Sequence, residues 1–279
     1  TRTQYGLTIP QGTSIIHATL DPGDLNKDIA ADHALIGDAR LTLEALNDAI
    51  RDRLGGNSRG RYDSIIQQIR SIKNQWLRSW APKLNSDEVP LTPYRVIRDL
   101  MNTVDVADTI ITHDAGSVRD QLSPFWEATT PLSYIGWGKT TQLGYGLGLT
   151  MGAKLACPDK LCINVWGDAA IGFTGMDFET AVRERIPILS ILFNNFSMAI
   201  ELPIMKVSTE KYRSTDISGN YADMARAFGG YGERIESPDQ IIPALKRGIE
   251  KTQEGTPALL EFITSQELEI SLIGQRGFE

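Results

Sequence analysis

Apolar and polar residues follow a regular pattern over most of the chain. From Pro93 onward, their spacing predicts strands at 109–113, 161–167, 188–193, 231–235 and 257–263. It predicts helices between and beside them at 93–104, 142–156, 176–185, 221–228 and 238–252. Runs such as LCINVWG and ALLEFIT are apolar at successive positions, which is typical of strands covered by helices on both faces. The sequence therefore predicts an α/β domain with a mostly parallel sheet.

The chain before Pro93 has a different pattern. Residues 14–20 predict a strand that ends at a turn, and the apolar residues of 41–54 follow helical spacing. One strand and one helix cannot enclose a core, so we expect residues 1–54 to be the end of a second α/β domain. The other expected divisions are a linker with one helix at 55–92, the main α/β domain at 93–265 and a C-terminal tail at 266–279.

Composition excludes several classes of protein. Of the 279 residues, 41% are hydrophobic and 23% are charged, as in ordinary globular proteins. The net charge of −7, without a long basic run, argues against nucleic acid and anionic membrane surfaces as partners. No apolar run predicts a membrane span and the first residues do not resemble a signal peptide, so we expect a cytoplasmic location. The spacing of Cys157 and Cys162 fits no redox or zinc motif, and the three histidines are scattered.

Polar residues at the ends of two predicted strands are the first candidates for chemistry. The strand at 161–167 runs into Asp168, and the next strand runs into the sequence NNFS, which contains Asn195. Carboxyl ends of neighbouring parallel strands lie at one edge of a sheet, and carboxylate and amide oxygens suit Mg²⁺ or Ca²⁺. The small residues after Asp168 leave backbone N–H groups open to a phosphate. Gly-Asp and Asn-Asn are also common turn dipeptides, so each pair alone has an ordinary structural explanation.

Together, a Gly-Asp pair and an Asn-Asn pair with 27 residues from Asp168 to Asn195 resemble a known motif. It is the thiamine diphosphate motif of the pyruvate decarboxylase and acetolactate synthase superfamily. The resemblance extends to GYG at 144–146, to AFGGYGERIESPDQIIPAL and to GTPALLEFIT. It implies the thiamine diphosphate-binding fold, with thiamine diphosphate and Mg²⁺ or Ca²⁺ as cofactors. It also implies that Asp168, Asn195 and the backbone carbonyl of Ser197 bind the metal.

The same resemblance implies the contacts to thiamine diphosphate. The Ser117 hydroxyl and the N–H groups of Ala169 and Ala170 would contact the diphosphate, although Ala169 stands where Gly is usual. The carbonyl of Thr141 and the N–H of Leu143 would hold the pyrimidine ring, and the Leu143 side chain would bend the cofactor. A leucine at a helix start is also an ordinary core residue. The full implied cofactor-binding set is Gly116, Ser117, Thr141, Leu143, Gly167, Asp168, Ala169, Ala170, Asn195, Ser197 and Ile200.

Glu201 distinguishes between reaction types. The 2-oxo acid decarboxylases of the superfamily carry an active-site Glu at this position, whereas acetolactate synthases have an apolar residue there and a Trp where this chain has Ile204. The resemblance thus implies a lyase or transferase that cleaves or forms C–C bonds of a 2-oxo acid or related acyl donor. Glu201 and Leu143 would have the catalytic roles. An acetolactate synthase-like carboligase and a non-catalytic cofactor-binding fragment or subunit stay open, as does a solvated Glu201 at a helix end.

The superfamily's pyrimidine-binding domain, which carries a further catalytic Glu, has no counterpart in these 279 residues. The resemblance implies that this domain comes from a missing N-terminal part and packs from a neighbouring subunit of a dimer or tetramer. We therefore expect this chain alone to be inactive. The substrate, the presence of FAD in the central domain, and the choice between a fragment and a split subunit are left open.

Overall fold

The computed structural model describes residues 9–10, 12–27, 29–57, 60, 62–136 and 142–271. They belong to two compact units, the first ending at Ser79 and the second beginning at Trp80. Within these described ranges, no helix is long and apolar enough to cross a membrane.

The first unit contains a two-stranded parallel sheet and two helices. Strand β1 (Ile16–Thr19) pairs with β2 (His33–Ile36), and a short 3₁₀ helix, η2 (Pro22–Asp24), lies between them in the chain. Helix α1 (Ala39–Leu54) has no buried residue. Helix α2 (Tyr62–Leu84) starts in this unit and ends in the second, and it takes up most of the segment 55–92 that was expected to be a linker with one helix.

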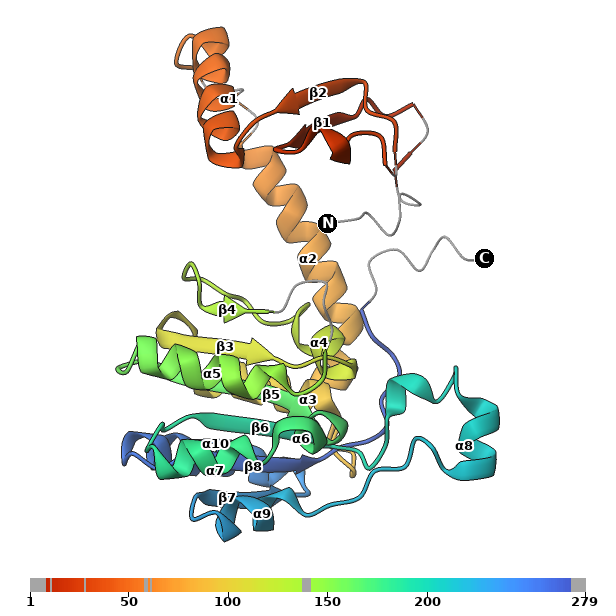
Figure 1. Ribbon diagram of the computed structural model, residues 1–279, viewed down its shortest axis with the longest axis vertical. Coiled ribbons are helices and arrows are strands. Elements are labelled where there is room, and N and C mark those ends of the chain that lie inside the picture. Colours follow the sequence, from red (N-terminus) through yellow and green to blue (C-terminus); the bar gives the residue numbers. More distant parts are fainter. Residues whose placement is uncertain are drawn as a thin grey trace. The chain divides into compact units, whose positions relative to one another are not determined.

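The second unit is built on a six-stranded sheet in the order β4-β3-β5-β6-β8-β7, in which every pairing is parallel (Figure 1). The prediction of an α/β domain with a parallel sheet is therefore confirmed. The strands are β3 (Thr109–His113), β4 (Tyr134–Ile135), β5 (Leu161–Gly167), β6 (Leu189–Asn194), β7 (Tyr231–Ile235) and β8 (Ala258–Ile263).

The helices that begin in this unit are α3 (Pro93–Thr103), α4 (Ser117–Leu122), α5 (Tyr145–Ala156), α6 (Asp168–Thr174), α7 (Asp177–Arg183), α8 (Lys206–Tyr212), α9 (Tyr221–Ala227) and α10 (Pro238–Gln253), with short 3₁₀ helices η3 (Val106–Asp108) and η4 (Ala199–Glu201). Helix α3 precedes the first strand of this unit, and the α-helices after it lie between successive strands. Helix α5 packs on β3 and β5, and α9 packs on β7 and β8. Helix α10 packs on β6, β7, β8 and α3.

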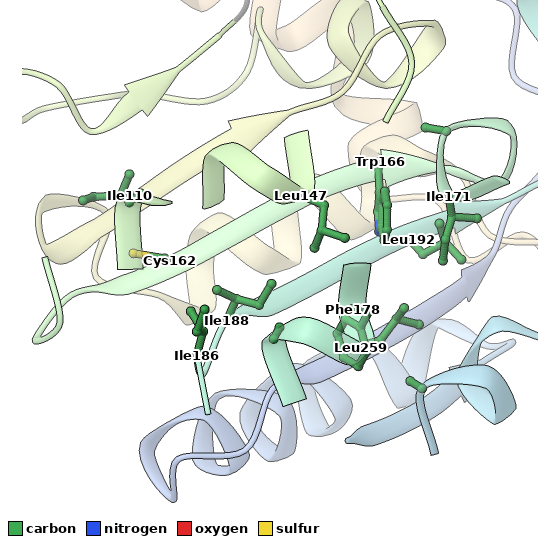
Figure 2. Packing of buried hydrophobic residues seen from close by; sticks show 14 residues of the cluster. Ile110, Leu147, Cys162, Trp166, Ile171, Phe178, Ile186, Ile188, Leu192 and Leu259 are labelled. Carbon is green, nitrogen blue, oxygen red and sulfur yellow. The ribbon is translucent and has the colours of Figure 1, made fainter. Parts of the chain in front are cut away.

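Buried apolar side chains join the sheet to its helices. Trp166 of β5 and Leu192 of β6 are fully buried and belong to one cluster with Leu147 of α5 and Phe178 of α7 (Figure 2). Ile163, an odd number of residues from Trp166, is also fully buried, and alternate side chains of a strand point to opposite faces. Both faces of the sheet are therefore covered, which explains why its central strands are apolar at successive positions.

Candidate functional site

A cleft of about 280 Å³ opens at the carboxyl ends of β5 and β6, where Gly167 of β5 is the register partner of Phe193 of β6. Its walls are α4 with the residues just before it, Leu143 ahead of α5, the β5–α6 junction and the segment from the end of β6 through η4. Thr141 lies outside the described residues. All the other predicted site residues line this cleft: Gly116, Ser117, Leu143, Gly167, Asp168, Ala169, Ala170, Asn195, Ser197, Ile200 and Glu201.

Asp168 is the first residue of α6 and is only 4% exposed. Its Oδ1 accepts a hydrogen bond from the N–H of Ala169 at 2.8 Å, and its Oδ2 accepts from the N–H groups of Asn195 at 3.1 Å and Ser197 at 3.2 Å. The Oδ1 of Asn195 accepts from the same Ser197 N–H at 3.0 Å. The carboxylate and amide oxygens of two separate strand ends thus approach one N–H group.

The environment of Asp168 suits a hard cation. Burial raises the pKa of Asp168 to about 6, although hydrogen bonds from the backbone N–H groups of Ala169, Ser197 and Asn195 oppose this rise. A divalent cation would offset the cost of burying the carboxylate. The described ranges hold no cluster of three or more His, Cys, Asp or Glu side chains, so a cation here would take its other protein ligands from amide and carbonyl oxygens.

Ala169 and Ala170 form the first turn of α6. Ala169 has no positive φ, so the residue that replaces the usual glycine causes no backbone strain. Its N–H already donates to Asp168, whereas the family resemblance implies that this N–H contacts the diphosphate. On the opposite wall, Gly116 adopts φ +80° and precedes Ser117, the first residue of α4.

Asp114, which no sequence motif singled out, holds two walls of the cleft together. Its fully buried carboxylate accepts hydrogen bonds from Ala115 N–H at 2.8 Å, Gly144 N–H at 2.9 Å and Gly146 N–H at 3.1 Å. Burial raises the pKa of Asp114. The available signal was an acidic residue at the carboxyl end of a strand, two residues before Gly116 in HDAGSV.

Leu143 and Glu201 face the same cleft from different elements. Leu143 is half-buried, lines the cleft and packs against the hydrophobic cluster of the sheet, so it is both a wall residue and a core residue. Glu201 ends η4, where its N–H donates to the carbonyl of Met198 at 2.9 Å. Ile204 is 77% exposed and does not line the cleft.

The cleft lining also includes residues that no sequence motif singled out. Arg119 lines it and forms an ion pair with Asp120 at 2.7 Å. Gln121, Phe193 and Thr264 complete part of its lining. A basic residue therefore belongs to the cleft lining, two positions after Ser117.

Residues 114–262, which contain this cleft and most of the sheet, match the profile of the family described as "Thiamine pyrophosphate enzyme, C-terminal TPP binding domain". The chain belongs to this thiamine pyrophosphate enzyme family. Thiamine pyrophosphate is another name for thiamine diphosphate, so the resemblance noted in the sequence is confirmed.

Several curated relatives are similar to this chain over most of its length. A probable acetolactate synthase large subunit of Methanococcus aeolicus is 26% identical over 271 residues, which are 93% of this chain and 44% of that relative. The 2-hydroxyacyl-CoA lyase of Arabidopsis thaliana is 27% identical over 76% of this chain and 38% of its own length. The acetolactate synthase isozyme 3 large subunit of Escherichia coli is 24% identical over 86% of this chain and 42% of its own length. The chain thus spans less than half the length of these relatives.

Proposed function

We propose that the intact protein is a thiamine diphosphate- and Mg²⁺-dependent enzyme that cleaves or forms a C–C bond of a 2-oxo acid or related acyl donor. The observation that carries this proposal is the approach of the Asp168 carboxylate and the Asn195 amide oxygen to one N–H group, that of Ser197. Two buried or half-buried oxygens at adjacent strand ends form the core of a site for a hard cation and its bound diphosphate.

Each wall of the cleft has one task in this proposal. Asp168, Asn195 and the Ser197 carbonyl hold Mg²⁺, and the Ser117 hydroxyl donates to the diphosphate. Leu143 is wedged between cleft and core and fixes the shape of the bound cofactor. When bound, thiamine diphosphate supplies the electron sink that lets a bond beside a carbonyl carbon break or form.

Glu201 supports decarboxylation as the first reaction type. Glu201 lines the cleft, from which its carboxyl group could donate a proton to a bound reactant or accept one from it. An acetolactate synthase-like carboligase is the second candidate, favoured by the names of the relatives in Methanococcus and Escherichia. Ile204 at the position of the expected Trp, together with Glu201, opposes that second candidate.

The chain would work as part of a larger assembly. Its relatives are more than twice as long as the matched segment, which supports a missing N-terminal pyrimidine-binding domain. We propose that this domain packs against the cleft from a neighbouring subunit of a dimer or tetramer, and that the present chain alone is inactive. A cofactor-binding subunit without turnover is the remaining alternative.

Calorimetry of thiamine diphosphate binding to the full-length protein tests the cation site. Asp168→Ala should lower the affinity measured with Mg²⁺ to the value that the parent shows without Mg²⁺. Asp177→Ala is the matched control, because Asp177 is exposed and outside the cleft lining, and it should bind like the parent. Unchanged affinity in Asp168→Ala would remove the assignment. Assays of CO₂ release and of carboligation product with a panel of 2-oxo acids then separate the two reaction types.

A further inference from the structure

Glu261 is a fully buried carboxylate in β8, outside the cleft lining. Its Oε1 accepts a hydrogen bond from the Asn194 side-chain amide at 2.7 Å. Its Oε2 accepts from the N–H groups of Tyr221 at 3.0 Å and Ala222 at 2.9 Å, at the start of α9. A carboxylate in the interior of a sheet is costly, and this one is held by polar hydrogens from two different elements.

Glu261 determines the orientation of the Asn194 side chain. An ionised carboxylate only accepts hydrogen bonds, so the amide of Asn194 must turn its NH₂ group toward Glu261. The Oδ1 of Asn194 then points the other way, where it accepts from the N–H of Phe196 at 3.1 Å. Glu261 in β8 thus determines that the Asn194 side chain presents its oxygen, and not its NH₂ group, to the segment that follows β6.

Phe196 needs this support because its φ is +57°, a left-handed conformation that is uncommon for residues other than glycine. Its carbonyl accepts from the N–H of Ile217 at 3.0 Å, so both backbone groups of the turn are bonded. The turn lies between Asn195 and Ser197, and it directs the Ser197 N–H to the oxygens of Asp168 and Asn195.

A second connection leads from Glu261 to Asp168. Tyr221, whose N–H donates to Glu261, has its hydroxyl within hydrogen-bond distance of two backbone carbonyl oxygens, at 3.3 Å from that of Asp168 and 3.2 Å from that of Ser218. Glu261 is therefore bonded to two elements next to the proposed cation site. One is β6, which leads into Asn195, and the other is α9, whose Tyr221 hydroxyl lies near the Asp168 carbonyl.

We propose that Glu261 is a positioning residue for this cation site. It fixes the Asn194 amide, which holds the turn at Phe196 and so aims the oxygens of Asn195 and Ser197. Glu261 itself touches neither metal nor cofactor. The inference rests on the proposed function, since it concerns how the same site is shaped.

Two single substitutions and their combination test the direction of the hydrogen bonds. In Glu261→Gln, the new amide must use its oxygen for the N–H groups of α9, so its NH₂ faces the NH₂ of Asn194 and turns that amide over. Phe196 then loses its acceptor. In Asn194→Asp, a second carboxylate lies against Glu261 where the 2.7 Å hydrogen bond was. The double variant restores the pairing, because the introduced amide donates to the introduced carboxylate, whose other oxygen accepts from Phe196.

The measurement is the Mg²⁺ affinity of the full-length protein at saturating thiamine diphosphate, by calorimetry. Each single variant should bind Mg²⁺ at least about tenfold more weakly, the usual scale for losing a residue that orients a metal ligand. The double variant should return to the affinity of the parent. Glu233→Gln is the control, because Glu233 lies on the neighbouring strand β7 and pairs with Arg247, and it should leave the affinity unchanged.

Parent-like affinity in both single variants, or a double variant as weak as the single ones, would overturn the inference. If a single variant does not fold, the double variant alone is the test. Parent-like Mg²⁺ affinity in the double variant supports the positioning role of Glu261, and weak affinity contradicts it. Asp168→Ala separates this inference from the proposed function. If Asp168→Ala loses Mg²⁺ binding while the Glu261 and Asn194 variants keep the affinity of the parent, the cation site stands and only the role of Glu261 is removed.

Discussion

Replacing Asp114 tests how the cleft is held together. The Asp114 carboxylate bonds three buried or partly buried N–H groups, and Ala would remove all three acceptors at once. Each N–H left without a partner costs about 1–3 kcal/mol. The substitution also removes the cost of burying the carboxylate, which is the cost that raises its pKa, and this offsets part of the loss. We therefore expect Asp114→Ala to lower the free energy of unfolding by about 3 kcal/mol, the lower end of the combined cost of three unpaired N–H groups.

Asp114→Asn should be milder, because the amide oxygen can keep the bonds to Ala115 and Gly144, which share Oδ1, and lose only the bond to Gly146. We expect a loss of about 1 kcal/mol.

Scanning calorimetry of the metal-free protein measures both losses. For a domain of this size they correspond to a decrease in melting temperature of about 10 °C for Ala and about 3 °C for Asn. Asp120→Asn is the control, since it removes only the partly exposed ion pair with Arg119 and should cost under about 1 kcal/mol. The reasoning is refuted if Asp114→Ala costs no more than Asp120→Asn.

Metal affinity, turnover and the need for other domains each provide a further test. Because burial raises the pKa of Asp168 to about 6 and a cation requires the ionised carboxylate, the affinity for Mn²⁺ alone should be about tenfold weaker at pH 5 than at pH 7 by electron paramagnetic resonance. A flat profile over this range would contradict the assignment. Glu201→Gln should lower turnover roughly a hundredfold while thiamine diphosphate affinity stays unchanged, and a change of only a few-fold would favour the carboligase. A purified polypeptide of residues 1–279 should release no CO₂ from any 2-oxo acid, and measurable release would contradict its dependence on a further domain.

The regular part of the fold was predictable because its apolar residues follow a clear period. The predicted strands at 109–113, 161–167 and 231–235 have the bounds of β3, β5 and β7. The missed elements are short or lack an apolar stripe. Strand β2 is four exposed residues and β4 is only two residues, while α4 and α8 are mostly polar turns of helix whose position depends on tertiary contacts.

The cleft residues were predictable where a fixed spacing marks them. Asp168 and Asn195 follow neighbouring strands, and their spacing matches the family motif. Asp114 and Glu261 were missed for the same physical reason. They bond backbone N–H groups 30 and 40 residues away, and a backbone N–H has no residue type that a sequence motif could show.

The position of β8 constrains how this domain can be made on the ribosome. β8 is the last strand along the described part of the chain, yet it lies between β6 and β7. Until residues 258–263 leave the exit tunnel, β6 has an open edge and β7 has no neighbour to pair with. Folding of this half of the sheet therefore waits for β8, and a nascent chain stalled before Ala258 exposes the unpaired edges of β6 and β7 to the cell's chaperones.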